Sequence, residues 1–200
     1  SQQPRAIDLE VAIPGSMPVE IHLFDVAGEY FQGWEQTAKL HFLDRAKAMI
    51  FVIDPLAIPE VRRDVGATRQ SGRVDIAEGQ AEVAYASAVD RLRQEGLAVK
   101  KRKLAVVLSK ADILLELPGC ENLRSGLSGD IRTWLQDVGL DQLVRRMDRD
   151  FAEIRYFLSD SMVTGTDDDL ARPVAPVLWV LGSSGATGAL GGMAKQEVHA

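Results

Sequence analysis

The chain has very little cysteine and no long hydrophobic run. Cys120 is the only cysteine among 200 residues, which excludes a disulfide scaffold and a zinc site built from several cysteines. The apolar runs 48–53 and 104–108 have the length of a strand, far below the ~20 residues of a membrane-spanning helix. The N-terminus also lacks a basic segment followed by an apolar core. We therefore expect a cytoplasmic protein, or a cytoplasmic domain, that does not insert into a membrane.

An excess of basic charge is missing as well. Lysine and arginine number 23 against 29 aspartate and glutamate residues, for a net charge of −6, which argues against a nucleic-acid partner. The apolar fraction of 46% and the charged fraction of 26% are ordinary for a globular protein. We expect one domain over residues 1–181 and a flexible glycine-rich tail over 182–200.

Strand and helix patterns alternate along the chain. The alternating runs 7–13 and 19–24 flank a turn and predict a β-hairpin. Apolar runs predict further strands at 48–53, 104–108 and 154–158. Residues 55–79 have no clear period and are expected to form a long loop. Helical spacing occurs at 36–46, 81–97, 123–138, 140–151 and 174–181, so the order predicts an α/β fold with a mainly parallel sheet flanked by helices.

Polar signatures follow three of the predicted strands, where open α/β sheets bind their ligands. Residues 25–29 read Asp-Val-Ala-Gly-Glu, residues 109–112 read Ser-Lys-Ala-Asp, and residues 159–161 read Ser-Asp-Ser. A strand-ending aspartate can hold Mg²⁺, and a nearby glycine lets backbone N–H groups approach a phosphate. Each signature also has a simpler interpretation, since Asp-x-x-Gly is a common turn and Ser-Lys-Ala-Asp can cap a helix.

In this order, the three signatures resemble those of the Ras-like P-loop GTPases, over about residues 7–181. The resemblance implies that Asp25 reaches the Mg²⁺ shell and that the Gly28 N–H contacts the γ-phosphate of GTP. Glu29 stands where many of these proteins have a glutamine that positions the attacking water, so we expect slow hydrolysis.

The other two signatures resemble the guanine-recognition segments of the same family. Asp112 is implied to accept hydrogen bonds from guanine N1–H and the 2-amino group, a pair of donors that adenine lacks. The stem of Lys110 is implied to lie along the base. Ser109 replaces the usual Asn or Thr and keeps a hydroxyl for tying loops together. The stretch Ser159, Asp160 and Ser161 is implied to face the guanine carbonyl.

One hallmark of the family is absent. The phosphate loop G-x-x-x-x-G-K-[ST] does not occur, and no Lys-Ser or Lys-Thr follows the glycines of 182–192. The chain starts with Ser1 rather than methionine, so one interpretation is a fragment whose first strand, phosphate loop and first helix lie upstream. A second is a degenerate domain that binds partners without tight nucleotide binding. A third is an unrelated α/β enzyme.

The resemblance implies a guanine-nucleotide switch that uses GTP or GDP and Mg²⁺ and regulates a protein effector. The alternative is a pseudo-GTPase scaffold. The 55–79 segment contains four arginines, and we weigh an arginine finger at the γ-phosphate against a solvated loop. The Asp25-to-Asp112 separation resembles bacterial double-GTPase domains of conflict or signalling systems.

Overall fold

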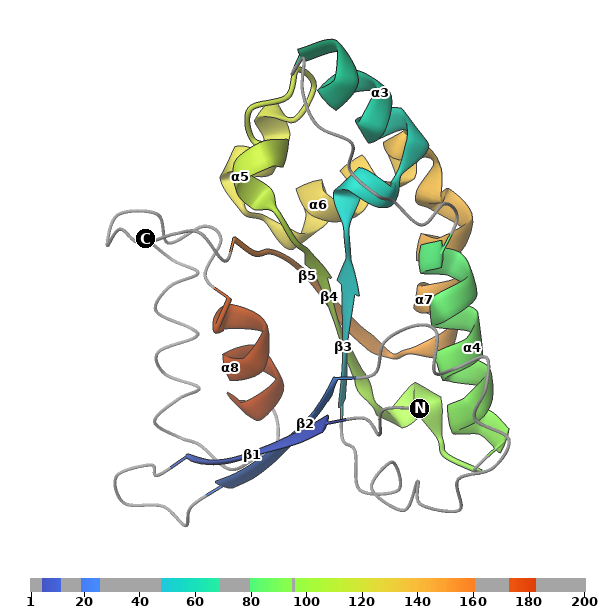
Figure 1. Cartoon of the computed structure of the whole chain (residues 1–200). Helices are drawn as coiled ribbons and strands as arrows, with labels where there is room; N and C mark the ends of the chain where they lie inside the picture. The colour runs from blue at the N-terminus through green and yellow to red at the C-terminus, as the bar shows by residue number, and fades with distance from the viewer. Residues whose placement is uncertain are drawn as a thin grey trace. The chain divides into compact units, whose positions relative to one another are not determined.

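The computed structural model describes residues 5–11, 19–25, 48–68, 80–94, 96–160 and 173–182 (Figure 1). The chain divides into two compact units. One contains Ser1–Arg45 with Val177–Ala200, and the other contains Ala46–Pro176. Each unit is described by itself below.

The first unit contains a β-hairpin. Strand β1 (Arg5–Val11) pairs antiparallel with β2 (Val19–Asp25), with Arg5 opposite Asp25 and Val11 opposite Val19. This confirms the hairpin that the alternating sequence predicts. The helix predicted over 36–46 lies outside the described residues, as does the tail after residue 182.

The second unit is built on a three-stranded parallel sheet. Its strands are β3 (Ala48–Ile53), β4 (Lys103–Leu108) and β5 (Glu153–Leu158), in the order β3-β4-β5. The register places Ile53, Leu108 and Leu158 in one row, so the residues after them start at the same edge of the sheet. Helices flank this sheet (Figure 1), which confirms the predicted α/β fold.

The helices follow the predicted order with one correction. Residues 55–79 were expected to form one loop, but the 3₁₀ turn η1 (Pro55–Ala57) and the helix α3 (Pro59–Thr68) occupy the first part. Among residues 59–65 of α3, whose burial is described, only Val61 is buried, which explains why the apolar pattern is too weak to predict this helix. The remaining elements are α4 (Gln80–Gln94), η2 (Val99–Lys101), α5 (Ala111–Leu114), η3 (Glu121–Ser125), α6 (Ser128–Leu135), the π turn η4 (Gln136–Leu140), α7 (Asp141–Asp150) and α8 (Ala175–Gly182).

The predicted break between the last two long helices is present. Gly139 has a φ of +91°, which glycine adopts without a steric penalty, and the chain leaves helical geometry there between α6 and α7. None of the helices in the described ranges combines the length and the apolar content needed to span a bilayer.

Much of the core of the second unit lies on the face of the sheet that carries Phe51, Val106 and Tyr156. The rings of Phe51 on β3 and Tyr85 on α4 meet edge to face, with centroids 5.5 Å apart. Tyr156 on β5 is buried on the same face, beneath α6 and α7. On the opposite face, Val52 is 60% exposed.

Burial of tyrosine makes the fold sensitive to alkali. Burial raises the pKa of Tyr156 to about 12, and Asp148 adds to the increase while Arg132 opposes it. Because an unfolded tyrosine ionises near pH ~10, the unfolded state loses its proton first and becomes favoured as the pH rises. We expect the free energy of unfolding to fall from about pH 10 to 12, by up to about 1.4 kcal/mol per pH unit for this group.

Urea denaturation at pH 9, 10 and 11 tests this expectation. The Tyr156→Phe variant should show a shallower loss of stability over the same range. A Tyr156 phenol that titrates at its ordinary pKa, followed by its absorbance, would contradict the assignment.

Candidate functional site

The three loops that follow β3, β4 and β5 are joined by backbone hydrogen bonds. The Ser109 N–H donates to the Ile53 carbonyl at 3.1 Å, and the Ser159 N–H donates to the Leu108 carbonyl at 2.8 Å. The Ala111 N–H in turn donates to the Ser159 carbonyl at 3.2 Å. These bonds continue the sheet ladder into the loops and bring the predicted segments 109–112 and 159–160 together.

Lys110 sits at the centre of this arrangement. Its φ of 54° and ψ of 42° place it in the left-handed region, and it is the one non-glycine residue with positive φ in the described part of the chain. A non-glycine residue in this region costs roughly 1–2 kcal/mol, so the surrounding contacts must hold it there. Strain of this kind is concentrated at functional sites.

Asp54 supplies the main side-chain contact to Lys110. The Lys110 Nζ lies 2.7 Å from Asp54 Oδ2, and Asp54 Oδ1 accepts a hydrogen bond from the Leu56 N–H at 3.0 Å. Asp54 therefore caps η1 and holds the lysine ammonium with the same carboxylate. Both side chains are partly exposed, which leaves this edge of the sheet accessible.

Ser109 ties the β4 loop to β3 through its side chain. Its hydroxyl donates to the Ile53 carbonyl at 3.2 Å, the same oxygen that accepts the Ser109 N–H. This contact matches the loop-tying role that the sequence suggests for a hydroxyl at this position.

Asp112 lies in the first turn of α5 and its side chain is exposed. Within the described ranges, its carboxylate has no hydrogen bond or ion pair. Both oxygens are therefore available to accept hydrogen bonds from a ligand. The neighbouring loop after β5 presents a half-buried Ser159 and a buried Asp160.

The remaining predicted residues lie in the other unit or outside the described residues. Asp25 ends β2 in the first unit, and its backbone pairs with Arg5. Gly28, Glu29 and Ser161 lie outside the described residues. Of the four arginines in 55–79, Arg62 and Arg63 lie on α3. The Arg62 side chain donates to the Leu56 and Ala57 carbonyls, while Arg63 pairs with Glu60 at 3.3 Å. Both side chains therefore already have partners on η1 or α3.

The residue types present show whether the chain could hold the expected Mg²⁺ ion. Within the described residues, no three side chains of His, Cys, Asp and Glu gather into a metal-binding group. Mg²⁺ commonly keeps several waters and takes one or two carboxylates together with substrate phosphates. A single aspartate is compatible with that requirement, and Asp25 is the residue that the resemblance implies for the ion.

Sequence reasoning missed Asp54. The signal was available, because Asp54 follows an apolar strand in the same way as Asp25 follows β2. The segment after Asp54 lacks a glycine at the spacing found in 25–28, so this position does not stand out as a ligand-binding signature. Its role depends on a partner 56 positions away in the chain, which only the parallel pairing of β3 and β4 brings near.

Comparison with known proteins agrees with this arrangement. No curated protein and no solved structure matches the chain significantly. The family model described as Double-GTPase 2 matches residues 1–169, which is most of the chain. The three joined loops lie at the carboxyl ends of the parallel strands, which is where open α/β sheets bind their ligands. The chain therefore belongs to the Double-GTPase 2 family.

Proposed function

We propose that this protein is a guanine-nucleotide-dependent switch that regulates a protein partner. The observation that carries the proposal is the β4 loop, in which Lys110 is held in a left-handed conformation beside the exposed and unpaired carboxylate of Asp112. Contacts from both neighbouring strands hold this loop in place. Its two side chains therefore need no further ordering when a ligand binds.

Guanine recognition follows from the chemistry of these groups. The Asp112 carboxylate accepts two hydrogen bonds, from guanine N1–H and from the 2-amino group. Lys110, whose ammonium is held by Asp54, offers its aliphatic stem to the face of the base. The backbone N–H groups of 159–161 are the proposed donors to the guanine carbonyl.

The resemblance assigns the phosphate end of the nucleotide to the signature at residues 25–29. Asp25 would hold Mg²⁺, which neutralises phosphate charge when bound, and the Gly28 N–H would contact the γ-phosphate. Loss of that phosphate would release the 25–35 segment and so change the partner surface. Glu29 cannot donate a hydrogen bond to the attacking water when ionised, which supports slow hydrolysis. The proposal extends to a cytoplasmic signalling role in a bacterium, as the resemblance of the Asp25-to-Asp112 separation to bacterial double-GTPase domains suggests.

A pseudo-GTPase scaffold is the second candidate function. It is favoured by the absence of G-x-x-x-x-G-K-[ST] from the 200 residues. Without that loop, the backbone cradle and the lysine that hold the β- and γ-phosphates are not supplied by these residues.

Nucleotide binding separates the two functions. We expect titration calorimetry of the 200-residue chain to show GTP and GDP binding that is weaker than micromolar, because the phosphate cradle is absent. For a switch, protein purified after expression of its native gene should carry guanine nucleotide, measured by chromatography after denaturation. A complete protein without nucleotide would favour the scaffold, and sub-micromolar GTP binding to the 200-residue chain would contradict the argument from the missing cradle.

A further inference from the structure

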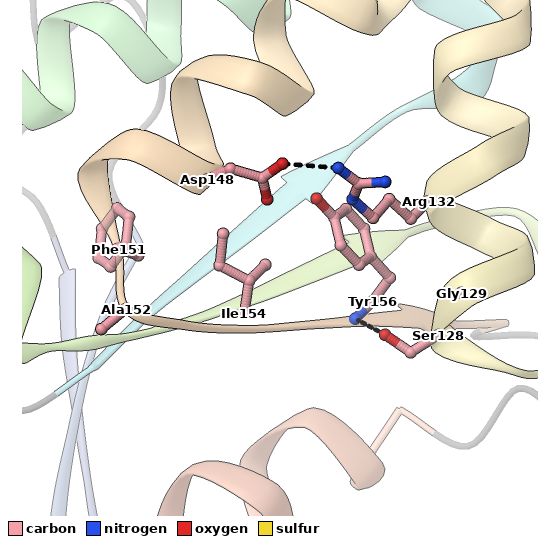
Figure 2. A pocket seen from close by; sticks show the side chains of 8 residues that line it. All are labelled: Ser128, Gly129, Arg132, Asp148, Phe151, Ala152, Ile154 and Tyr156. Atoms are coloured by element: carbon pink, nitrogen blue, oxygen red, sulfur yellow. Dashed lines mark hydrogen bonds and ion pairs between the residues drawn. The ribbon is translucent and has the colours of Figure 1, made fainter.

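A polar cavity of about 270 Å³ lies between β5, α6 and α7 (Figure 2). Its polar lining comes from Ser128 and Gly129 at the start of α6, Arg132 on α6, Asp148 on α7, and Tyr156 on β5. Ile154 and Tyr156 belong to the first part of β5, whereas Ser159 and Asp160 follow the end of that strand. The cavity is therefore separate from the candidate base site and independent of the proposed function.

The Tyr156 hydroxyl is an unsatisfied polar group beside this cavity. Tyr156 is 3% exposed, and its buried hydroxyl has no hydrogen-bond partner. Figure 2 shows the phenol pointing into the space between Arg132 and Asp148. Buried polar groups are nearly always paired in folded proteins, so an unpaired one indicates a missing ligand or water.

Ser128 and Gly129 add donors at the start of α6. The Ser128 Oγ accepts the Tyr156 N–H at 2.9 Å, which leaves the hydroxyl proton of Ser128 available for a further acceptor. Gly129 has no side chain, so it lines the cavity with its backbone. Its N–H belongs to the first turn of an eight-residue helix, where amides have no acceptor within the helix and the helix dipole favours an anion.

The guanidinium of Arg132 can bind an incoming anion, because its ion pair with Asp148 is partly exposed to water. Arg132 Nη2 lies 2.6 Å from Asp148 Oδ2, and both side chains are 40% exposed. Ion pairs this exposed contribute little to stability and are readily exchanged. An anion with a higher charge can therefore take the guanidinium from Asp148, which also uncovers the Tyr156 hydroxyl.

We propose that this cavity binds a phosphoryl group, with Arg132, Ser128, the Gly129 amide and Tyr156 as donors. These donors come from a helix N-terminus, two α6 side chains and a strand, so they approach the cavity from several directions. A tetrahedral phosphoryl group offers three or four oxygens to such a set, whereas a carboxylate offers two. Asp148 acts as an internal competitor that keeps the affinity low.

The test is an NMR titration of the ¹⁵N-labelled chain with inorganic phosphate at constant ionic strength. The Gly129 amide should shift with a saturable curve. Arg132→Gln should weaken binding by about tenfold or more, because a charge-assisted pair is lost, and Tyr156→Phe should weaken it several-fold. Asp148→Asn should strengthen binding, since it frees Arg132 without removing a donor. A purely structural role for the Arg132–Asp148 pair predicts no such increase.

Further ligands distinguish the source of the phosphoryl group. Tighter binding of O-phosphoserine than of phosphate would indicate a group carried on another molecule, and the reverse order would indicate the free ion. Arg145→Gln, on the exposed part of α7 where Arg145 pairs with Asp141 at 3.2 Å, is the matched control and should bind phosphate normally. Non-saturable shifts, equal binding by Arg132→Gln, or acetate binding as tight as phosphate would overturn the proposal.

Discussion

Replacing Asp150 by alanine is expected to lower the free energy of unfolding by about 3–5 kcal/mol, as removal of one partner from a buried ionic network does. Asp150 is the last residue of α7 and its side chain is only 5% exposed. Such a loss is a large share of the stability of a domain this size.

The reason is that three groups converge on this one carboxylate. The Tyr85 hydroxyl donates to Asp150 Oδ2 at 3.1 Å, Arg93 pairs with Oδ1, and Arg146 Nε lies 3.7 Å from Oδ2. Tyr85 is fully buried, and burial followed by the charge of Asp150 raises the pKa of its phenol well above the ordinary value. Without the carboxylate, the Tyr85 hydroxyl is left buried with no acceptor and α4 loses its main polar link to α7.

Asp90 provides the matched control. Its carboxylate contacts the same two arginines, with Arg93 at 3.4 Å and Arg146 at 3.1 Å, but its side chain is 52% exposed. Asp90→Ala should therefore cost no more than about 1 kcal/mol. Urea denaturation followed by circular dichroism measures both variants, and similar losses for Asp90→Ala and Asp150→Ala would show that burial does not set the effect.

The second large effect is expected from Asp112→Asn in the nucleotide-loaded protein from the complete gene. We expect the affinity for guanine nucleotides to fall by roughly 100-fold, because two hydrogen bonds to a charged acceptor are lost. Xanthine nucleotides should bind better than before, since their 2-oxo group needs a donor and the asparagine amide provides one. Competition between GDP and XDP, measured by displacement of a fluorescent nucleotide, gives the ratio directly.

A carboxylate elsewhere on the same unit controls for the loss of charge. Asp137 is exposed in η4, beyond α6, and Asp137→Asn should leave the base preference unchanged. An Asp112→Asn protein that still prefers guanine would place the base site elsewhere. That result would leave the phosphate-binding prediction for the Ser128–Tyr156 cavity intact, because different residues carry it.

Local patterns were sufficient for most of the fold. The strand at 48–53 was predicted with its observed bounds, and those at 104–108 and 154–158 were predicted to within one residue, because uninterrupted apolar runs are typical of buried parallel strands. The break at Gly139 was readable because glycine alone accepts its backbone geometry without strain. Helix α3 was not predicted, since Val61 is the one buried residue among 59–65 and a single buried position gives no period to detect.

By itself, the sequence determined the order of the five strands, the α/β class, and the Ser-Lys-Ala-Asp segment that points to guanine. The tertiary structure decided which residues act together. Asp54 joins Lys110, Tyr85 joins Asp150, and Ser128 joins Tyr156 across separations of 56, 65 and 28 positions. Periodicity reports only which face of an element is buried, whereas these pairs depend on the register of the parallel strands and on how the helices pack against them.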